Sequence, residues 1–108
     1  MINQTHVQAI YLKPERAQEY LRHHAEPWPE VVARLRAAGL HDYTIHYQPE
    51  AGLLVQRFSI TADDSAAALR GLAERPEMQP WLQLMMSCQT PMAGYASWAP
   101  MPEVFRLE

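Results

Sequence analysis

Tyr20-Leu-Arg-His-His-Ala-Glu-Pro-Trp-Pro-Glu30 is the stretch that decides the fold, because it joins two helices at a sharp corner. Tyr20 and His24 are four residues apart, so on a helix they lie one turn apart on the same face. A proline stands on either side of Trp28; the first ends one helix, and the second suits the first turn of the next. The corner therefore presents a phenol and an imidazole beside a large aromatic ring, a set that can hold a small polar ligand and move protons on it.

The two helices on either side of this corner each have one apolar side. The first begins near Pro14 and repeats its inward positions at the i, i+3, i+4, i+7 spacing. We expect His24 to face inward on it and His23 to point roughly the other way. The second helix covers residues 29–38, and Gly39 should stop it. The inward residues expected on the two helices are Ala17, Tyr20, Leu21 and His24, then Val31, Val32, Leu35 and Ala38.

The rest of the chain alternates between strand-like and helix-like segments. Residues 41–48 alternate well, with His41, Tyr43, Ile45 and Tyr47 expected on one face. A turn at residues 49–52 makes residues 53–61 their hairpin partner. Other strands are expected at 6–12 and 103–107, further helices at 65–74 and 77–88, and a loop at 90–102.

The resulting order, β-α-β-β-α-β, predicts an α+β protein of the ferredoxin-like class. Its four-stranded antiparallel sheet would carry helices on one face only. Because the strands carry apolar residues on both faces, a second copy should cover the open face, which gives a homodimeric α/β barrel.

Composition sets limits on partners and cofactors. A chain of 108 residues, 48% hydrophobic and 19% charged, is one globular domain, residues 1–108. A net charge of −3 gives no reason to expect nucleic acid or a membrane as partner, and no signal peptide or bilayer span is visible, so we expect a cytoplasmic location. Cys88 is the only cysteine, and we expect it to be a buried thiol. The histidines lack the spacing of a metal site, so no metal is expected.

The chain resembles the L-rhamnose mutarotases over nearly its whole length. The resemblance rests on Glu19-Tyr20, on Arg22-His23-His24 followed by Trp28-Pro29-Glu30, on Gly39 leading into Tyr43, on the region of Trp81 and on Glu103-Val104-Phe105. It implies a small cytoplasmic homodimer with a ferredoxin-like fold that uses neither a metal nor an organic cofactor.

The resemblance also assigns roles to particular residues. The histidine that matches His24 is taken as the proton donor in this family. Residues that match Tyr20, Tyr43 and a tryptophan pair contact the sugar. Here that pair is Trp81-Leu82, so Leu82 replaces one aromatic ring, and Ala25 stands where an asparagine is frequent. The sugar implied is L-rhamnose, L-fucose or a related 6-deoxy-L-hexose.

Mutarotation suits an imidazole. The reaction removes a proton from the anomeric hydroxyl and delivers one to the ring oxygen, so that the ring opens and recloses from the other face. A histidine with a pKa of about 6.5 can act as base or acid in neutral solution. Trp81 would offer a flat apolar surface to the C–H side of the pyranose.

Other interpretations stay open at this point. His24 could be a hydrogen-bonded core histidine, Tyr20, Tyr43 and Trp81 could be core aromatics, and Trp28 could simply fill the corner. A cofactor-free or haem-type monooxygenase can use the same fold. The chain could also form a non-catalytic dimer that binds a sugar or is purely structural. This interpretation predicts that His24→Ala changes only the stability of the protein.

Overall fold

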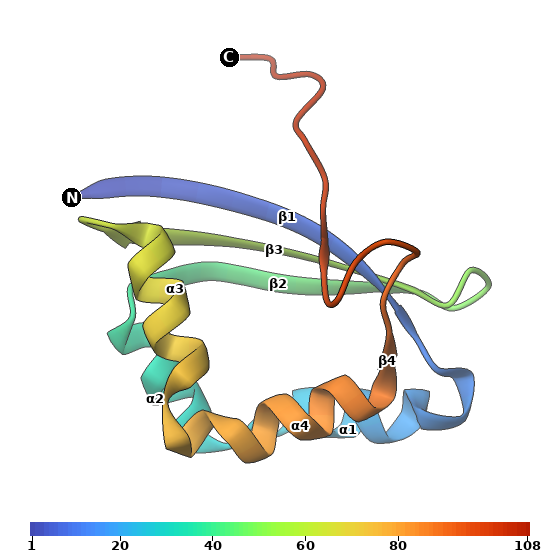
Figure 1. Ribbon diagram of the computed structural model, residues 1–108. Helices are drawn as coiled ribbons and strands as arrows, with labels where there is room; N and C mark the ends of the chain where they lie inside the picture. Colours follow the sequence, from blue (N-terminus) through green and yellow to red (C-terminus); the bar gives the residue numbers. More distant parts are fainter.

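Three long antiparallel strands form one layer of the molecule, and four helices cover one face of it (Figure 1). The computed structural model describes residues 1–108. The strands are β1 (Ile2–Leu12), β2 (Leu40–Gln48), β3 (Leu53–Ala62), β4 (Gln89–Thr90) and β5 (Ala99–Pro100). The helices are α1 (Ala17–Ala25), α2 (Pro29–Ala37), α3 (Ser65–Glu74) and α4 (Gln79–Cys88), with 3-10 turns η1 (Pro14–Arg16) and η2 (Pro76–Met78). None of the helices combines the length and the apolar character that crossing a bilayer requires.

The order of the strands in the sheet fits the ferredoxin-like class. This order is β2-β3-β1-β4, and β5 also pairs with β1. β1 and β3 are antiparallel neighbours along their length, from the pair Ile2–Ala62 to the pair Tyr11–Leu53. β3 is therefore held between β1 and its hairpin partner β2, as in a split βαβ unit. The ferredoxin-like α+β class is confirmed.

The pairing register divides the side chains of the sheet into a helix-facing side and an outer side. Ile10, Leu54 and Ile60 lie on the helix-facing side and are at most 1% exposed. On the outer side polar residues dominate, and the hydroxyls of Thr5 and Ser59 share a hydrogen bond of 3.0 Å. The apolar character that we expected on both faces is therefore concentrated on the face that the helices cover.

A bulge at Asp42 changes the alternation of β2. The register shifts between His41 and Thr44, and Asp42 adopts a positive φ of 50°. Such a conformation is tolerated by aspartate better than by most residues. The prediction that His41 shares a face with Tyr43 is wrong for this reason: His41 lies on the outer side, where its Nε2 is 2.9 Å from the hydroxyl of Thr61.

Gly39 ends α2, as predicted, and it is required for steric reasons as well. Its φ is 95°, and a Cβ at this position would collide with the carbonyl oxygen of Thr61 on β3. The carbonyl of Gly39 accepts a hydrogen bond of 3.0 Å from the N–H of Thr61. This close approach connects the end of α2 to the sheet and so fixes the direction in which β2 starts.

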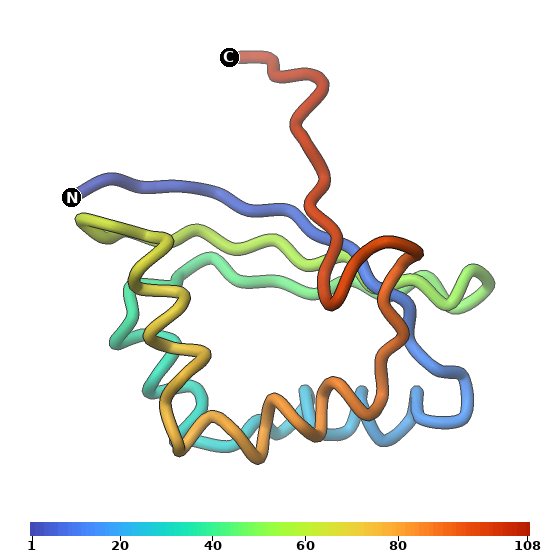
Figure 2. Tube along the Cα trace, viewed as in Figure 1, coloured from blue at the N-terminus to red at the C-terminus, as the bar shows by residue number.

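The last strand is not where the sequence pattern placed it. Residues 101–108 form no regular structure, and the fourth position of the sheet is taken by β4 and β5, which are two residues each. The N–H of Met101 makes the final backbone bond to β1, to the carbonyl of Val7. Pro102 has no N–H to continue the ladder. The C-terminal segment then leaves the sheet on the side away from the helices (Figure 2).

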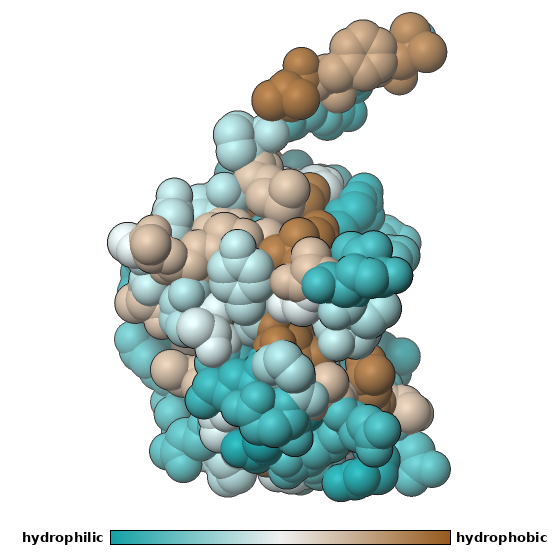
Figure 3. Space-filling model, turned by 90° about the vertical axis from the view of Figure 1, so that its right-hand side faces the viewer, coloured by the Kyte–Doolittle hydropathy of each residue, from teal (hydrophilic) through white to brown (hydrophobic).

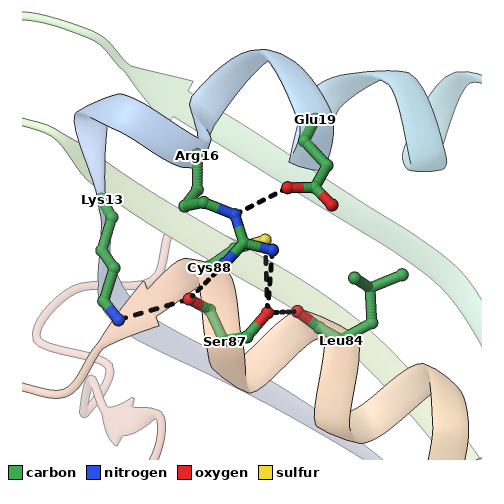
Figure 4. Close-up of polar contacts among 6 residues, drawn as sticks. All are labelled: Lys13, Arg16, Glu19, Leu84, Ser87 and Cys88. Carbon is green, nitrogen blue, oxygen red and sulfur yellow. Dashed lines mark hydrogen bonds and ion pairs between the residues drawn. The ribbon is translucent and has the colours of Figure 1, made fainter.

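A polar clamp joins the start of α1 to the end of α4 (Figure 4). The guanidinium of Arg16 donates to the hydroxyl of Ser87 at 3.1 Å, and the ammonium of Lys13 donates to the carbonyl of Ser87 at 3.3 Å. Arg16 also donates to Glu19 at 2.6 Å. Two cations at the C-terminus of α4 complement its free carbonyls and its dipole. The clamp holds the two helices side by side and so sets which residues of α1 meet α4.

Candidate active site

A cavity of about 360 Å³ opens between α1, α2, α4 and the edge strand β2. This volume lies within the usual range of small-molecule sites. The chain brings together three of the predicted site residues here: His24 from α1, Tyr43 from β2 and Trp81 from α4. The remaining wall is apolar, and the full lining consists of His24, Pro27, Val31, Val32, Leu35, Tyr43, Ile45 and Trp81.

His24 is held in one tautomer by its own helix. Its Nδ1 lies 2.8 Å from the backbone carbonyl oxygen of Tyr20. A carbonyl only accepts, so Nδ1 carries the proton of the neutral ring, and Nε2 keeps a free lone pair. Burial lowers the pKa of His24 below its ordinary value of 6.5; the bond to Tyr20 opposes this, and neighbouring His23 lowers the pKa further. At neutral pH the ring is therefore uncharged, with Nε2 available as a base.

Tyr43 reaches from β2 across the helix-facing side of the sheet. Its hydroxyl donates to Oε1 of Gln56 at 2.6 Å, and its ring lies 5.4 Å from that of Phe58. The residue as a whole is 38% exposed, but its hydroxyl end is desolvated. Burial raises the pKa of Tyr43, and nearby Tyr20 raises it further. Tyr43 therefore stays a neutral phenol at any physiological pH.

Tyr20 lies behind the cavity and does not line it. It is 2% exposed, its ring packs on that of His24 with centroids 4.2 Å apart, and its hydroxyl accepts from Nε2 of Gln89 at 3.3 Å. Burial raises the pKa of Tyr20 to about 12, although the bond from Gln89 opposes the shift. Leu82 is half-buried and does not line the cavity either. Sugar contacts of Tyr20 and Leu82 therefore stay predictions.

The aromatic corner is more tightly joined than the sequence suggested. Trp28 and Trp81 meet edge to face with centroids 5.1 Å apart. His23 contacts both, at 6.3 Å from Trp28 and 6.2 Å from Trp81, so the prediction that it points away from the site is wrong. The chain turns back at Pro27 directly after α1, and this turn places Trp28 over His23. Trp28 packs the corner, as predicted, and its ring also packs against that of Trp81.

Three glutamines on the inward side of the fold were not predicted from the sequence pattern. Gln56 and Gln89 are buried, and Gln8 is half-buried. Each bonds to another polar side chain near the cavity, Gln56 to Tyr43 and Gln8, and Gln89 to Tyr20. A polar residue at an inward strand position was the available signal, since such residues are rarely left unpaired. No group of three or more possible metal ligands occurs in the chain.

Comparisons with known proteins agree on one family. The sequence model described as L-rhamnose mutarotase matches residues 5–107. An L-rhamnose mutarotase from Agrobacterium fabrum is 40% identical over 63 residues, which cover 58% of this chain and 56% of the relative. One from Sinorhizobium fredii is 35% identical over 97 residues, 89% of this chain and 90% of the relative.

A solved structure resembles the whole fold. The crystal structure of an L-rhamnose mutarotase from Formosa agariphila superposes with a TM-score of 0.75 at 22% identity, covering 97% of this chain and 99% of that one. The structural likeness supports the fold, and the sequence matches carry the assignment. The chain belongs to the L-rhamnose mutarotase family.

Proposed function

We propose that this protein interconverts the α and β anomers of L-rhamnose, with His24 as its acid–base group. The observation that carries the proposal is the free Nε2 of a neutral His24 on the wall of a cavity that also holds Trp81 and Tyr43. Family membership supplies the reaction class, and the cavity supplies a place for a pyranose. The monooxygenase and non-catalytic readings gain no support from the matched relatives.

The proposed reaction needs only one residue that exchanges protons. Neutral His24 takes the proton of the anomeric hydroxyl, so the O–H bond breaks and an Nε2–H bond forms. The electron pair left on the anomeric oxygen forms a C=O bond while the bond between the anomeric carbon and the ring oxygen breaks. The ring oxygen takes the electron pair and then the proton from Nε2. Rotation about the next C–C bond and the reverse steps give the other anomer.

The energetics of this route fit the site. A positioned acid–base group typically contributes about 10²–10⁴-fold, which suffices for a reaction that already proceeds in water. The lowered pKa keeps His24 in the basic form that the first step requires. Because both phenols have raised pKa values, neither acts as a base, and Tyr43 places the sugar from the cavity wall.

The apolar wall supports a 6-deoxy sugar as the substrate. Trp81 offers its ring to the C–H side of the pyranose, and α2 contributes Val31, Val32 and Leu35. A methyl group in place of a hydroxymethyl group leaves no hydroxyl unpaired against this wall. L-fucose meets the same condition, so the choice between the two sugars rests on the remaining hydroxyls.

We also propose that the protein works as a homodimer through the outer side of the sheet. The C-terminal segment projects from that side, and its apolar side chains are unprotected (Figure 3). Val104 is 92% exposed and Phe105 is 78% exposed. Exposed apolar side chains of this kind are stabilised when another surface covers them. A second copy of the chain is the partner that a symmetric interface would supply. A cytoplasmic location, which cell fractionation would test, is part of the same proposal.

Anomer exchange measured by NMR tests the proposed reaction. One anomeric proton of L-rhamnose is saturated, and the loss of signal from the other is followed with and without protein. We expect fast exchange with the wild type and a loss of at least a hundredfold with folded His24→Ala. Arg22→Ala, an exposed change on the same helix, is the control and should keep full activity. A wild-type protein that does not accelerate the exchange of either L-rhamnose or L-fucose would refute the proposal.

A further inference from the structure

A row of three hydrogen-bonded polar side chains crosses the helix-facing side of the sheet. It starts at Tyr43 on β2, passes through Gln56 on β3 and ends at Gln8 on β1, and both of its bonds are 2.6 Å. Gln56 is 5% exposed and stands between Leu54 and Phe58 on the same side of its strand. A buried amide in such surroundings destabilises the fold unless its donors and acceptor find partners. Filling the core therefore does not by itself explain why polar side chains occupy these three positions.

The row has a fixed direction. Nε2 of Gln56 donates to Oε1 of Gln8, which turns Oε1 of Gln56 toward Tyr43. An amide oxygen only accepts, so the hydroxyl of Tyr43 must donate its single proton to Gln56. The phenolic oxygen then has lone pairs left and no proton left. Whatever it meets in the cavity must be a donor.

We propose that Gln56 is a positioning residue that makes Tyr43 a hydrogen-bond acceptor toward the sugar. The inference rests on the proposed function, and it specifies how the site recognises its substrate. Tyr43 and His24 both line the cavity, and in this proposal the phenolic oxygen of the first and Nε2 of the second present lone pairs to the ligand. The site therefore receives two hydroxyl protons from the sugar, the anomeric one at His24 and a second one at Tyr43.

This arrangement has a consequence for specificity. A sugar hydroxyl can turn its proton toward Tyr43, whereas a hydrogen, a methyl group or an ether oxygen at the same position cannot. Sites built to pair with a substrate hydroxyl discriminate strongly against analogues that lack it, because the protein group is left unpaired. Gln56 contributes to this discrimination without touching the sugar, because the orientation of its amide determines which way the Tyr43 proton points.

A double-mutant cycle on anomer exchange tests the inference. The variants are Gln56→Leu, Tyr43→Phe and the combination of both, each compared with wild type for kcat and KM with L-rhamnose. We expect Gln56→Leu to lower kcat/KM about tenfold, mainly through KM, which is the size of one lost hydrogen bond. In the Tyr43→Phe background the same change should have less than about a twofold effect, because there is no longer a phenolic proton to direct.

The buried Gln89 provides a matched control. Gln89→Leu removes an amide of the same size that bonds to Tyr20, so its effect should be the same with and without Tyr43→Phe. If Gln56→Leu does not fold, Gln8→Leu replaces it, because it releases the far end of the row and leaves Gln56 in place. Equal losses from the Gln56 or Gln8 change in both backgrounds would overturn the inference and leave mutarotation standing. A wild-type protein without activity would overturn both.

Discussion

Nδ1 of His24 and the backbone carbonyl oxygen of Tyr20 are 2.8 Å apart, one helical turn from each other on α1. α1 continues to Ala25, and its last backbone bond runs from the N–H of Glu26 to the carbonyl of Arg22, so the carbonyl of Tyr20 belongs to the regular part of the helix. The imidazole of His24 folds back along the helix to reach this carbonyl. The helix itself therefore fixes the tautomer of its histidine.

Activity should depend on pH through His24. If neutral His24 is the active form, kcat/KM for anomer exchange should fall on the acidic side, with an apparent pKa below 6.5, because burial lowers the pKa of His24. No loss should occur between pH 7 and about pH 9, since the pKa of Tyr20 is raised to about 12. Rates measured from pH 5 to 9, corrected for spontaneous mutarotation, check this. Activity that rises as the pH falls would show that the charged ring is the active form.

The lowered pKa of His24 also affects the stability of the folded protein. The pKa of His24 is lower in the folded state than its ordinary value of 6.5, so between these two values the unfolded chain binds more protons. The free energy of unfolding should therefore decrease as the pH falls below 6.5. Urea unfolding of the wild type and of His24→Gln at several pH values measures how the free energy of unfolding depends on pH. The variant should lose less stability than the wild type over this interval, and equal pH dependence of the two proteins would contradict the assignment.

Tyr20→Phe tests the predicted sugar contact of this residue. The change removes the acceptor of the buried Gln89 amide, so the free energy of unfolding should decrease by about 1 kcal/mol. His24 keeps its tautomer, because it uses the backbone carbonyl of residue 20. Tyr20 does not line the cavity, so the structure by itself gives its hydroxyl no contact with the sugar. If the predicted contact forms when the sugar binds, KM should rise more than kcat falls. A loss of stability with unchanged KM would assign Tyr20 a purely structural role.

Gly39→Ala tests the connection between α2 and the sheet. The new Cβ would meet the carbonyl oxygen of Thr61, and the positive φ of 95° is unfavourable for alanine. We expect the free energy of unfolding to fall by about 1–3 kcal/mol, measured by urea denaturation. Gly71→Ala is the control, because a Cβ there meets no atom within 4 Å, and in α3 the change should be neutral or stabilising. Similar losses in both variants would contradict the steric argument.

Removal of residues 103–108 tests the proposed dimer. If the apolar C-terminal segment lies on a second copy, the truncated chain should sediment as a monomer at concentrations where the full chain is a dimer. Phe105→Ala should weaken association in the same direction. Arg106→Ala should not, since Arg106 pairs with Glu103 within the segment itself. Identical sedimentation of the truncated and full-length chains would place the interface elsewhere.

The sequence predicted the parts of the fold that local patterns determine. Proline positions around Trp28 define the α1–α2 corner, and helical spacing puts His24 on the inward stripe, so its position on the cavity side could be predicted from its immediate neighbours. Gly39 was recognisable as a helix stop for the same reason. These features depend on residues within one or two helical turns of each other.

The errors came from contacts between distant parts of the chain. The strand predicted at 103–107 has a suitable composition, but the edge of β1 is already occupied by β4 and β5. His23 contacts Trp81, which is far from it in sequence, so helical spacing alone placed it on the wrong side. The role of Gln56 depends on partners on β1 and β2, and only the sheet register identifies both.

The bulge at Asp42 has a consequence for the substitutions that this strand can tolerate. In a regular strand His41 and Tyr43 would share a face, and a substitution at one would disturb the other. The extra residue directs His41 to the outer side and Tyr43 into the cavity. Residues at the start of β2 that face the outer side of the sheet can therefore be substituted without moving Tyr43 out of the cavity. Deleting one residue here would remove that independence and exchange the two environments.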